Sequence, residues 1–372
     1  MKKSDSPPIL INGGVIQNEH CFSEIINTEK LCELAPIIVK ENSFYSKKIQ
    51  GIFNFMPEYN DKLLDAIIPN LLDISTNKYG NYLIREILKS KEKNKVDRIF
   101  SKLKGHIKEL YNDECGKYVA QELIKKVDEE QLEEILDEFI DNNYFEKSIN
   151  CENEKLLFIK IIKRQAKNVN DKICEKILNS FVTLCDNIYF NEVIKALLSN
   201  CSENNYDLMF IKCCVNIYEI SKGRYGHSIV SFFIKNNKGR NINLLNKIYE
   251  SLKGKVYMLS KEEFGTYAIQ DAIVYGNPNQ RNQIIDEIKN NKFDLINLSK
   301  HKKGRFVIHK ILIYLDRETL GYLLYKLNEE KHKRKENKNK GNDDNNNNNK
   351  DYSKYFMPII IEIQAIFNNK SK

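Results

Sequence analysis

The stretch KYGNYLIREIL, from Lys78 to Leu88, carries a pattern that occurs eight times along the chain. Apolar residues stand at the third, fourth, seventh and eighth places after Gly80. This spacing puts their side chains on one stripe of an α-helix, which must be buried against a neighbour. The register residues of the copies are Tyr45, Gly80, Gly116, Glu154, Phe190, Gly226, Gly265 and Gly304, in steps of 35, 36, 38, 36, 36, 39 and 39 residues. A period this regular predicts a solenoid of helical repeats.

The apolar stripe is complete in seven copies, and only Lys48 breaks it in the first. The chain between copies is long enough for a second helix per repeat, as in KVDRIFSKL, LEEILDEFI, DKICEKILNSF and LLNKIYESL. Two segments, LKGHIKELYNDECG from Leu103 and LKGKVYMLSKEEFG from Leu252, share a longer register, which indicates duplication. We therefore expect an all-α chain.

The composition fits a helical array. The chain has 372 residues, of which 41% are hydrophobic and 30% charged, with 15 Gly and 7 Pro. No apolar run approaches the roughly 20 residues that span a bilayer, and Met1 to Asn18 lacks the features of a signal peptide. The nine Cys include no C-x-x-C pair, so we expect reduced thiols, no metal site and no cofactor. These features predict an intracellular protein without a membrane partner.

The two ends of the chain differ from the array in composition. We expect a lead-in over residues 1–30, a repeat domain over 31–328, a disordered Lys/Asn-rich insert over 329–351, and a capping helix with a tail over 352–372. The insert contains EEKHKRKENKNKGNDDNNNNNK, which has no apolar residue to bury. The last segment contains FMPIIIEIQAIF, which is apolar again and can cover the exposed face of the last repeat.

Each copy also carries three residues that a helix does not need for packing. They are the first, second and fifth residues after the register residue, and we call them the first, second and third ladder residues. The first and third are neighbours on one helix face, with the second between them. They are Ser46, Lys47, Gln50; Asn81, Tyr82, Arg85; Lys117, Tyr118, Gln121; Lys155, Leu156, Ile159; Asn191, Glu192, Lys195; His227, Ser228, Ser231; Thr266, Tyr267, Gln270; and Arg305, Phe306, His309. Recurring amides, aromatics and bases at one register predict a ligand-binding surface.

The motifs SKKIQ, GNYLIR, GKYVAQ, FGTYAIQ and GRFVIHKIL resemble the Pumilio-homology (PUF) family of RNA-binding repeats. The resemblance covers about Ile37 to Leu327 and is weaker from Glu154 to Ser231. It implies a right-handed α-solenoid crescent of eight three-helix repeats with terminal capping helices. It also implies a concave face that holds single-stranded RNA, one base per repeat, with the 5′ end at the C-terminal repeats.

The resemblance further implies a role for each ladder residue. First and third ladder residues would reach the Watson–Crick edge of a base, and second ladder residues would stack between bases. The base-edge candidates are Ser46, Gln50, Asn81, Arg85, Lys117, Gln121, Asn191, Lys195, His227, Ser231, Thr266, Gln270, Arg305 and His309, and the stacking candidates are Lys47, Tyr82, Tyr118, Tyr267 and Phe306. The chemistry agrees, because amides offer both a donor and an acceptor and aromatic rings offer stacking platforms.

Charge supplies a second indication. Of the 24 ladder positions six are basic and one, Glu192, is acidic. A groove of this sign attracts phosphate and makes binding dependent on salt. We expect Lys155 and Lys195 to contribute by this electrostatic route.

Departures from the family pattern predict a relaxed sequence preference. Within the family, Asn with Gln reads uracil, Ser or Cys with Gln reads adenine, and Ser with Glu reads guanine. No third ladder residue here is Glu, and Leu156 with Ile159 can read no base edge. The guanine-containing target that is usual for the family is therefore not expected.

Other classes of function remain open at this point. The six His are scattered, and neither a phosphate-binding glycine loop nor nucleophile or metal spacing occurs, so we do not expect an enzyme. The sequence favours a monomeric, cytoplasmic protein that binds messenger RNA in 3′ untranslated regions and controls translation or decay, with protein effectors as further partners. The alternatives are a nucleolar factor of ribosome biogenesis and a helical-repeat scaffold that binds protein.

Overall fold

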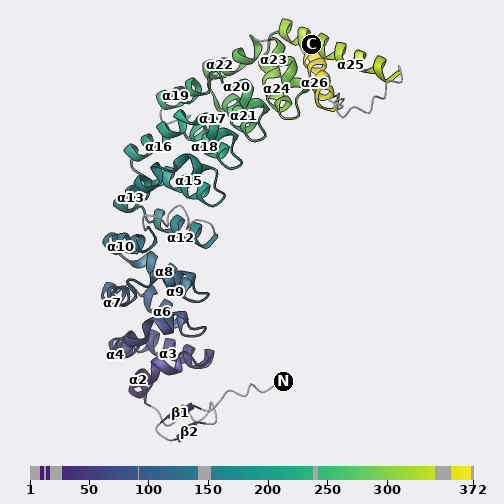
Figure 1. Ribbon diagram of the computed structural model, residues 1–372. Coiled ribbons are helices and arrows are strands. Elements are labelled where there is room, and N and C mark those ends of the chain that lie inside the picture. Colours follow the sequence, from purple (N-terminus) through teal and green to yellow (C-terminus); the bar gives the residue numbers. More distant parts are fainter. Residues whose placement is uncertain are drawn as a thin grey trace. The chain divides into compact units, whose positions relative to one another are not determined.

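The computed structural model of the chain describes residues 9–11, 14–16, 27–90, 92–140, 152–237, 242–290, 292–339 and 353–369. They belong to two compact units, Met1–Phe145 and Glu146–Lys372. Each unit is a stack of α-helices (Figure 1).

The first unit begins with a short antiparallel pair of strands, β1 (Ile9–Ile11) and β2 (Gly14–Ile16), which lies inside the expected lead-in. Its helices are α2 (Thr28–Ile38), α3 (Ser43–Phe55), α4 (Asn60–Ile67), α5 (Leu71–Thr76), α6 (Asn81–Lys89), α7 (Lys93–Leu103), α8 (Ile107–Asn112), α9 (Gly116–Lys126) and α10 (Glu129–Phe139). Two 3₁₀ turns, η2 (Pro57–Tyr59) and η3 (Ile68–Asn70), flank α4.

The described helices of the second unit are α12 (Glu152–Ile162), α13 (Lys167–Leu178), α14 (Phe181–Cys185), α15 (Phe190–Asn200), α16 (Glu203–Val215), α17 (Ile217–Lys222), α18 (His227–Asn237), α19 (Ile242–Leu252), α20 (Val256–Lys261), α21 (Gly265–Tyr275), α22 (Pro278–Lys289), α23 (Lys292–Lys300), α24 (Gly304–Ile311), α25 (Arg317–Asn339) and α26 (Ser353–Asn369). The 3₁₀ turn η4 (Leu312–Tyr314) follows α24.

The helices recur in threes: a short helix, a helix that carries the ladder residues, and a longer helix. The ladder helices α3, α6 and α9 of the first unit pack side by side, with α4, α7 and α10 along the other side of the stack (Figure 1). In the second unit α12, α15, α18, α21 and α24 pack in the same way, and α13, α16, α19 and α22 form the second row. The helical-solenoid prediction is confirmed, whereas the number of eight repeats and the right-handed crescent stay predictions.

The expected apolar stripes form the core of both units. From Leu83 to Leu312, every stripe residue of the seven complete copies is at most 3% exposed. Burying one such aliphatic side chain stabilises the folded state by about 1.5–3 kcal/mol. The four segments expected as second helices are also helical, in α7, α10, α13 and α19.

The register glycines are fixed by close packing rather than by backbone freedom. A Cβ atom on Gly80 would lie 2.7 Å from the backbone oxygen of Ile74 in the preceding short helix, and one on Gly116 would lie 2.7 Å from that of Leu110. The short helix and the ladder helix therefore touch backbone to backbone at these points.

The duplicated segments share a carboxylate clasp. Gly105 and Gly254 have φ of +85° and +76°, a conformation that favours glycine. The Glu138 carboxylate accepts hydrogen bonds from the Gly105 and Ile107 amides, both at 2.7 Å. The Glu287 carboxylate accepts from the amides of Gly254 and Val256 at 2.8 and 2.9 Å. Each clasp fastens the last helix of one repeat to the turn before its short helix.

The C-terminal segments correct one boundary. We expected disorder from Glu329, but α25 continues as a helix to Asn339, and 340–352 lie outside the described residues. Leu320, Leu323 and Leu327 are buried and anchor the helix. Glu329 then pairs with Lys326 at 2.9 Å and Lys333 at 2.7 Å, contacts that stabilise a helix without apolar burial.

Helix α26 covers the last repeat. It packs against α23, α24 and α25 and buries Phe356, Ile359 and Ile363. Among the described residues, no helix combines the length and the hydropathy needed to cross a membrane.

Candidate nucleic-acid interface

The ladder residues have a consistent pattern of exposure in both units. Second ladder residues point to solvent: Tyr82, Tyr118, Tyr267 and Phe306 are 52%, 46%, 48% and 41% exposed. First ladder residues such as Ser46, Asn81, Asn191 and Thr266 are buried, and most third ladder residues are half-buried. A row of exposed rings therefore stands beside a row of half-buried polar groups on each unit.

In α3, α6, α9, α15 and α24 a side chain just before the ladder helix accepts hydrogen bonds from backbone amides at the start of that helix. The Asn77 side-chain oxygen accepts hydrogen bonds from the Tyr79 and Gly80 amides, at 2.8 and 2.9 Å. Asn42, Asp113 and Asn187 hold equivalent amides, and the Nδ1 atom of His301 does so before α24. We did not identify these residues from the sequence, although each lies three places before a register residue and the spacing is visible there.

The turn before α18 uses a different acceptor. Gly223 occupies the place three before Gly226, and it has no side chain to accept a bond. The Asp186 carboxylate reaches over from the preceding repeat and accepts from the Tyr225 and Gly226 amides at 2.7 and 3.2 Å. A Cβ atom on Gly223 would lie 2.5 Å from that carboxylate, so glycine makes room for it.

In the first unit the ladder begins with an amide and a hydroxyl. The Gln50 amide nitrogen donates to the Ser46 hydroxyl at 3.0 Å, and that hydroxyl donates to the backbone oxygen of Tyr79 at 2.7 Å. Asn81 is 3% exposed and donates to the backbone oxygens of Asn77 and Lys78. Ser46 and Asn81 are therefore bonded within the protein, contrary to their expected role at a base edge, and Gln50 and Arg85 are the more accessible residues of the two pairs.

Basic side chains lie beside the exposed rings of the first unit. The Arg85 guanidinium lies 5.5 Å from the ring centroid of Tyr82 and 5.2 Å from that of Tyr118, so it contacts two successive platforms. Lys117 lies 5.3 Å from the Tyr118 ring. These contacts place positive charge beside flat rings, the combination that binds nucleobases and phosphates.

Lys155 does not fit its expected role as a phosphate contact. It is 8% exposed, and its ammonium lies 2.7 Å from the Glu152 carboxylate and 3.1 Å from that of Glu192. The hydrogen bond to Glu152 and the neighbouring negative charges raise the pKa of Lys155. Its charge is neutralised inside the protein, so this expectation is corrected.

Asn191 also departs from its expected role at a base edge. Its amide nitrogen donates to the backbone oxygens of Cys185 and Tyr225, at 2.9 and 2.8 Å, and its oxygen accepts from the Ser228 hydroxyl at 2.8 Å. The side chain is 4% exposed. Asn191 therefore joins three elements of the fold and has no group left for a base.

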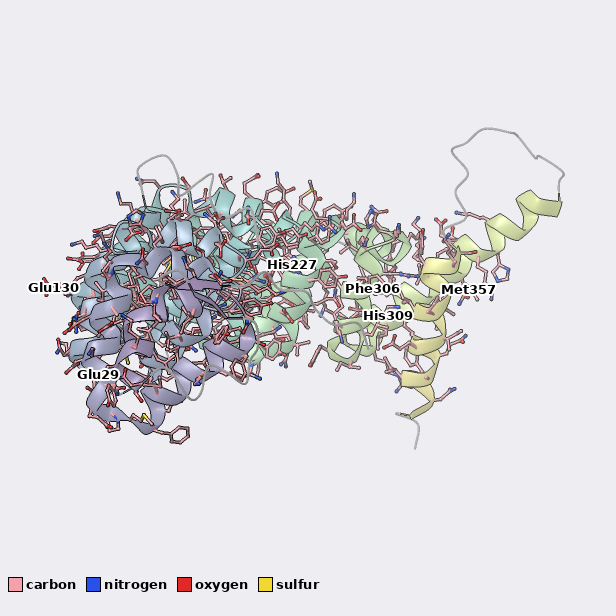
Figure 2. The ribbon with its side chains drawn as sticks, turned by 90° about the horizontal axis from the view of Figure 1, so that it is seen from below. Glu29, Glu130, His227, Phe306, His309 and Met357 are labelled. Carbon is pink, nitrogen blue, oxygen red and sulfur yellow. The ribbon has the colours of Figure 1, made fainter. Side chains whose placement is uncertain are left out.

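The His227 ring packs against two other aromatic rings. It stacks on Phe264 with centroids 5.9 Å apart and lies against Tyr267 at 5.3 Å. Figure 2 shows its place on the second unit. On α21 the Gln270 amide nitrogen donates to the Thr266 backbone oxygen at 3.3 Å, and Tyr267 stays exposed.

The ladder residues of α24 are engaged by α26. The His309 Nδ1 atom lies 2.5 Å from the Glu362 carboxylate, and Arg305 donates to the backbone oxygen of Lys354 at 3.3 Å. The Arg305 guanidinium lies 4.7 Å from the Phe306 centroid and 5.0 Å from that of Tyr355. Figure 2 shows Phe306 and His309 next to the helix that carries Met357. Arg305 and His309 are thus held by protein, contrary to their expected role at a base edge.

A recess of about 530 Å³ opens along α18. Its lining includes Lys195 of α15, His227, Ser231 and Lys235 of α18, and Tyr267 and Asp271 of α21. Lys235 and Asp271 were not identified from the sequence. Lys235 could have been found from the sequence, because it is a basic residue one helical turn after the third ladder residue, Ser231.

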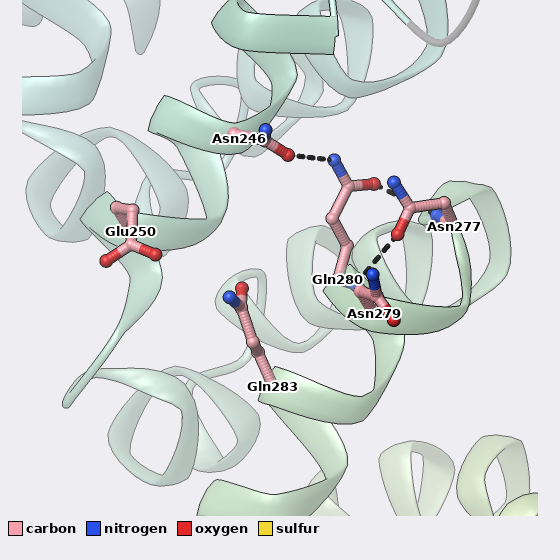
Figure 3. A pocket seen from close by; sticks show the side chains of 6 residues that line it. All are labelled: Asn246, Glu250, Asn277, Asn279, Gln280 and Gln283. Atoms are coloured by element: carbon pink, nitrogen blue, oxygen red, sulfur yellow. Dashed lines mark hydrogen bonds between the residues drawn. The ribbon is translucent and has the colours of Figure 1, made fainter.

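A second hollow, of about 360 Å³, lies between α19 and α22 (Figure 3). Gln280 and Asn277 form a reciprocal cap at the start of α22, and Gln280 donates to Asn246 at 2.7 Å. The same link joins Gln131 to Asp97 and Asn205 to Asp171, each 34 residues apart. This hollow is therefore part of the contact between repeats.

The Cys, His and carboxylate side chains are dispersed over the described part of the chain. Within the ranges that the structure describes, no group of three His, Cys, Asp or Glu side chains could hold a metal ion. The cysteines that the structure describes are free thiols, and burial raises the pKa of Cys32, Cys185 and Cys213, which keeps them protonated.

Comparison with known proteins identifies the repeats. The Pumilio-family RNA binding repeat matches residues 70–103, 113–140 and 255–289, which lie in both units. A Pumilio domain-containing protein of Schizosaccharomyces pombe is 21% identical over 263 residues, 71% of this chain and 38% of its own length. Pumilio homolog 12 of Arabidopsis thaliana is 20% identical over 262 residues, 70% of this chain and 41% of its own length. The chain spans about two fifths of the length of these relatives.

Among solved structures, the RNA-binding domain of yeast Puf5p bound to MFA2 RNA matches with a TM-score of 0.69 at 17% identity, over 91% of this chain and 98% of that one. The fold is that of a helical-repeat protein, with a ladder of exposed rings on each unit. The chain resembles the PUF family in the three segments that the repeat matches and in its fold.

Proposed function

We propose that this protein binds single-stranded RNA along the ladder helices of both units. The observation that carries the proposal is the row of four aromatic side chains at the second ladder position, each 41–52% exposed. An exposed ring is poorly used in packing, and it offers a base about 1–3 kcal/mol of stacking free energy. The matching repeats are described as RNA binding, and Puf5p was solved with RNA.

We further propose that the RNA is messenger RNA, bound in 3′ untranslated regions in the cytoplasm to control translation or decay. The structures of Puf3 and Puf4, each bound to an RNA 3′ untranslated region recognition sequence, are similar in fold at 18% identity and support this choice. The sequence preference is relaxed, because Lys155, Asn191, Arg305 and His309 are engaged within the protein. Base reading is then concentrated in the half-buried third ladder residues of α3, α6, α9 and α21, because Ser46, Asn81 and Thr266 are buried.

Crosslinking of the protein to RNA in cells, followed by sequencing of the attached RNA, tests this role. The expected result is enrichment of messenger RNA in 3′ untranslated regions, which is lost when Tyr82 and Tyr267 are both replaced by Ala. Enrichment of ribosomal precursor RNA would favour the nucleolar alternative. A protein that crosslinks to no RNA would favour the protein-binding scaffold.

A further inference from the structure

Three side chains that line the recess along α18 lie on one face of that helix. His227, Ser231 and Lys235 are spaced by four residues, which aligns their side chains along α18. Lys195 lies on the neighbouring helix α15, and Tyr267 and Asp271 lie on α21. The lining extends one turn beyond the ladder residues, to Lys235.

The Ser231 hydroxyl has no hydrogen-bond partner among the described residues, although its side chain is 7% exposed. Buried hydroxyl groups in proteins are nearly always hydrogen-bonded. Because this one lines the recess, it is placed to bond to an atom of a ligand there.

The charges around the recess favour an anion. Lys235 pairs with Asp271 at 3.0 Å, whereas Lys195 has no ion pair among the described residues, since Glu192 pairs with Lys155. Burial lowers the pKa of Lys195, and Lys235 lowers it further, while Glu192 acts in the opposite direction. Two lysines thus face one recess with only one of them paired, and an anion between them would relieve the repulsion.

The wall of the recess is aromatic. Tyr267 is 48% exposed, and the His227 ring lies against it and against Phe264. A ring that is already supported on one side provides a platform for a nucleobase on its free side. The recess thus combines a site for an anion with a site for a base.

We propose that this recess binds a phosphate group of the RNA strand, held by Lys195, Lys235 and the Ser231 hydroxyl, with the adjoining base against Tyr267. This proposal rests on the proposed function and assigns Lys195 and Ser231 to the RNA backbone rather than to a base edge. The middle of the second unit then adds affinity that does not depend on base sequence.

Binding of 12-nucleotide oligouridine and oligoadenosine, measured over a range of KCl concentrations, tests the proposal. Lys195→Met should weaken both RNAs by the same factor and flatten the slope of log affinity against log salt by about 0.7 for one lost phosphate contact. Ser231→Ala should weaken both RNAs without changing the slope, and its melting temperature should not fall because the hydroxyl has no partner to lose. Lys253→Met, which changes an exposed lysine directly after α19, is the control for net charge.

A 2′-O-methyl oligouridine with uncharged methylphosphonate linkages separates phosphate from base. The difference between the wild-type protein and Lys195→Met should vanish with this probe. A difference that persists, or a loss confined to one of the two RNAs, would assign Lys195 to a base edge and overturn the proposal. If Lys195→Met and Lys253→Met weaken binding equally, Lys195 acts only through the net charge of the protein, and the proposal is contradicted. A wild-type protein that binds neither RNA would instead contradict the proposed function.

Discussion

Tyr82 and Tyr267 are exposed platforms that contribute little to folding. Replacing either residue with Ala should weaken single-stranded RNA binding by about 1–3 kcal/mol, because one stacking surface is lost. The melting temperature should stay near that of the wild-type protein. Equilibrium binding together with circular dichroism measures both quantities. Tyr325→Ala, which removes a ring that is 64% exposed outside the ladder, is the matched control. Equal losses in all three variants would contradict a role of the ladder rings.

Arg85 contacts the rings of Tyr82 and Tyr118 and stands where the family pattern for uracil has Gln. Arginine only donates hydrogen bonds, so it cannot accept the uracil N3 proton. Arg85→Gln should sharpen the preference for uracil at one position, next to the 3′-terminal base of the site, and leave the other positions unchanged. Competition binding with all four bases at each position measures this. A shift at the 5′ end would show that the RNA runs in the opposite direction.

A substitution at Asn191 can show whether this residue supports the fold or recognises a base. Asn191→Ala removes the side-chain donor to the Cys185 backbone oxygen and one of several donors to that of Tyr225, which should cost about 1–3 kcal/mol of stability. Chemical denaturation measures this cost. Base preference should not change in conditions where the variant is folded. An altered preference with unchanged stability would restore Asn191 to the base-edge set.

At the scale of elements, α26 decides which ladder residues remain available. Since the Glu362 carboxylate and the Lys354 backbone hold His309 and Arg305, His309→Ala should leave RNA affinity and base preference nearly unchanged. Gln270→Ala on the adjacent ladder helix α21 is the contrast, and it should alter the preference near the 5′ end. Competition binding of the two variants gives the comparison. A change of preference in His309→Ala would mean that RNA displaces the contact with α26.

The sequence predicted the helices well because apolar spacing is local information. The stripe from Leu83 to Leu88, for example, requires only that a helix form and bury one face. The hydrogen bonds between helices that are far apart in the sequence could not be predicted in the same way. Glu138 reaches Gly105 and Gln280 reaches Asn246 across more than 30 residues, and only the packed repeat brings them together. The boundary at Glu329 was wrong because ion pairs sustain the end of α25 without apolar residues.

The ladder was predicted in register but only partly in role. The four aromatic residues of the predicted stacking set, Tyr82, Tyr118, Tyr267 and Phe306, are exposed, and their stacking role and that of Lys47 stay predictions. The roles of Lys155 and Asn191 could be read only in part from their own repeats. Glu152 and Cys185 lie in the same repeat as their partners, but Glu192, Tyr225 and Ser228 belong to the next one. A sequence motif describes one repeat, whereas the availability of a side chain depends on two.

At the scale of the whole molecule, both units carry ladder helices, and we propose that the two units contact RNA in different ways. The ladders of the first unit keep amides and rings, which we propose read and stack bases. The second unit has lost several edge-reading residues and gains the basic recess along α18. The protein should therefore bind RNA by combining a short preferred sequence with contacts to the backbone.

Base recognition by the ladder can be measured by selecting bound RNAs from a random single-stranded pool at physiological salt. We predict enrichment of a short motif with adenine at its 3′ end, opposite the ladder of α3, and a pyrimidine in the adjacent position, opposite Arg85 of α6. The positions opposite α12 and α15 should show no preference. A pool that is not enriched after repeated rounds would contradict RNA binding through the bases.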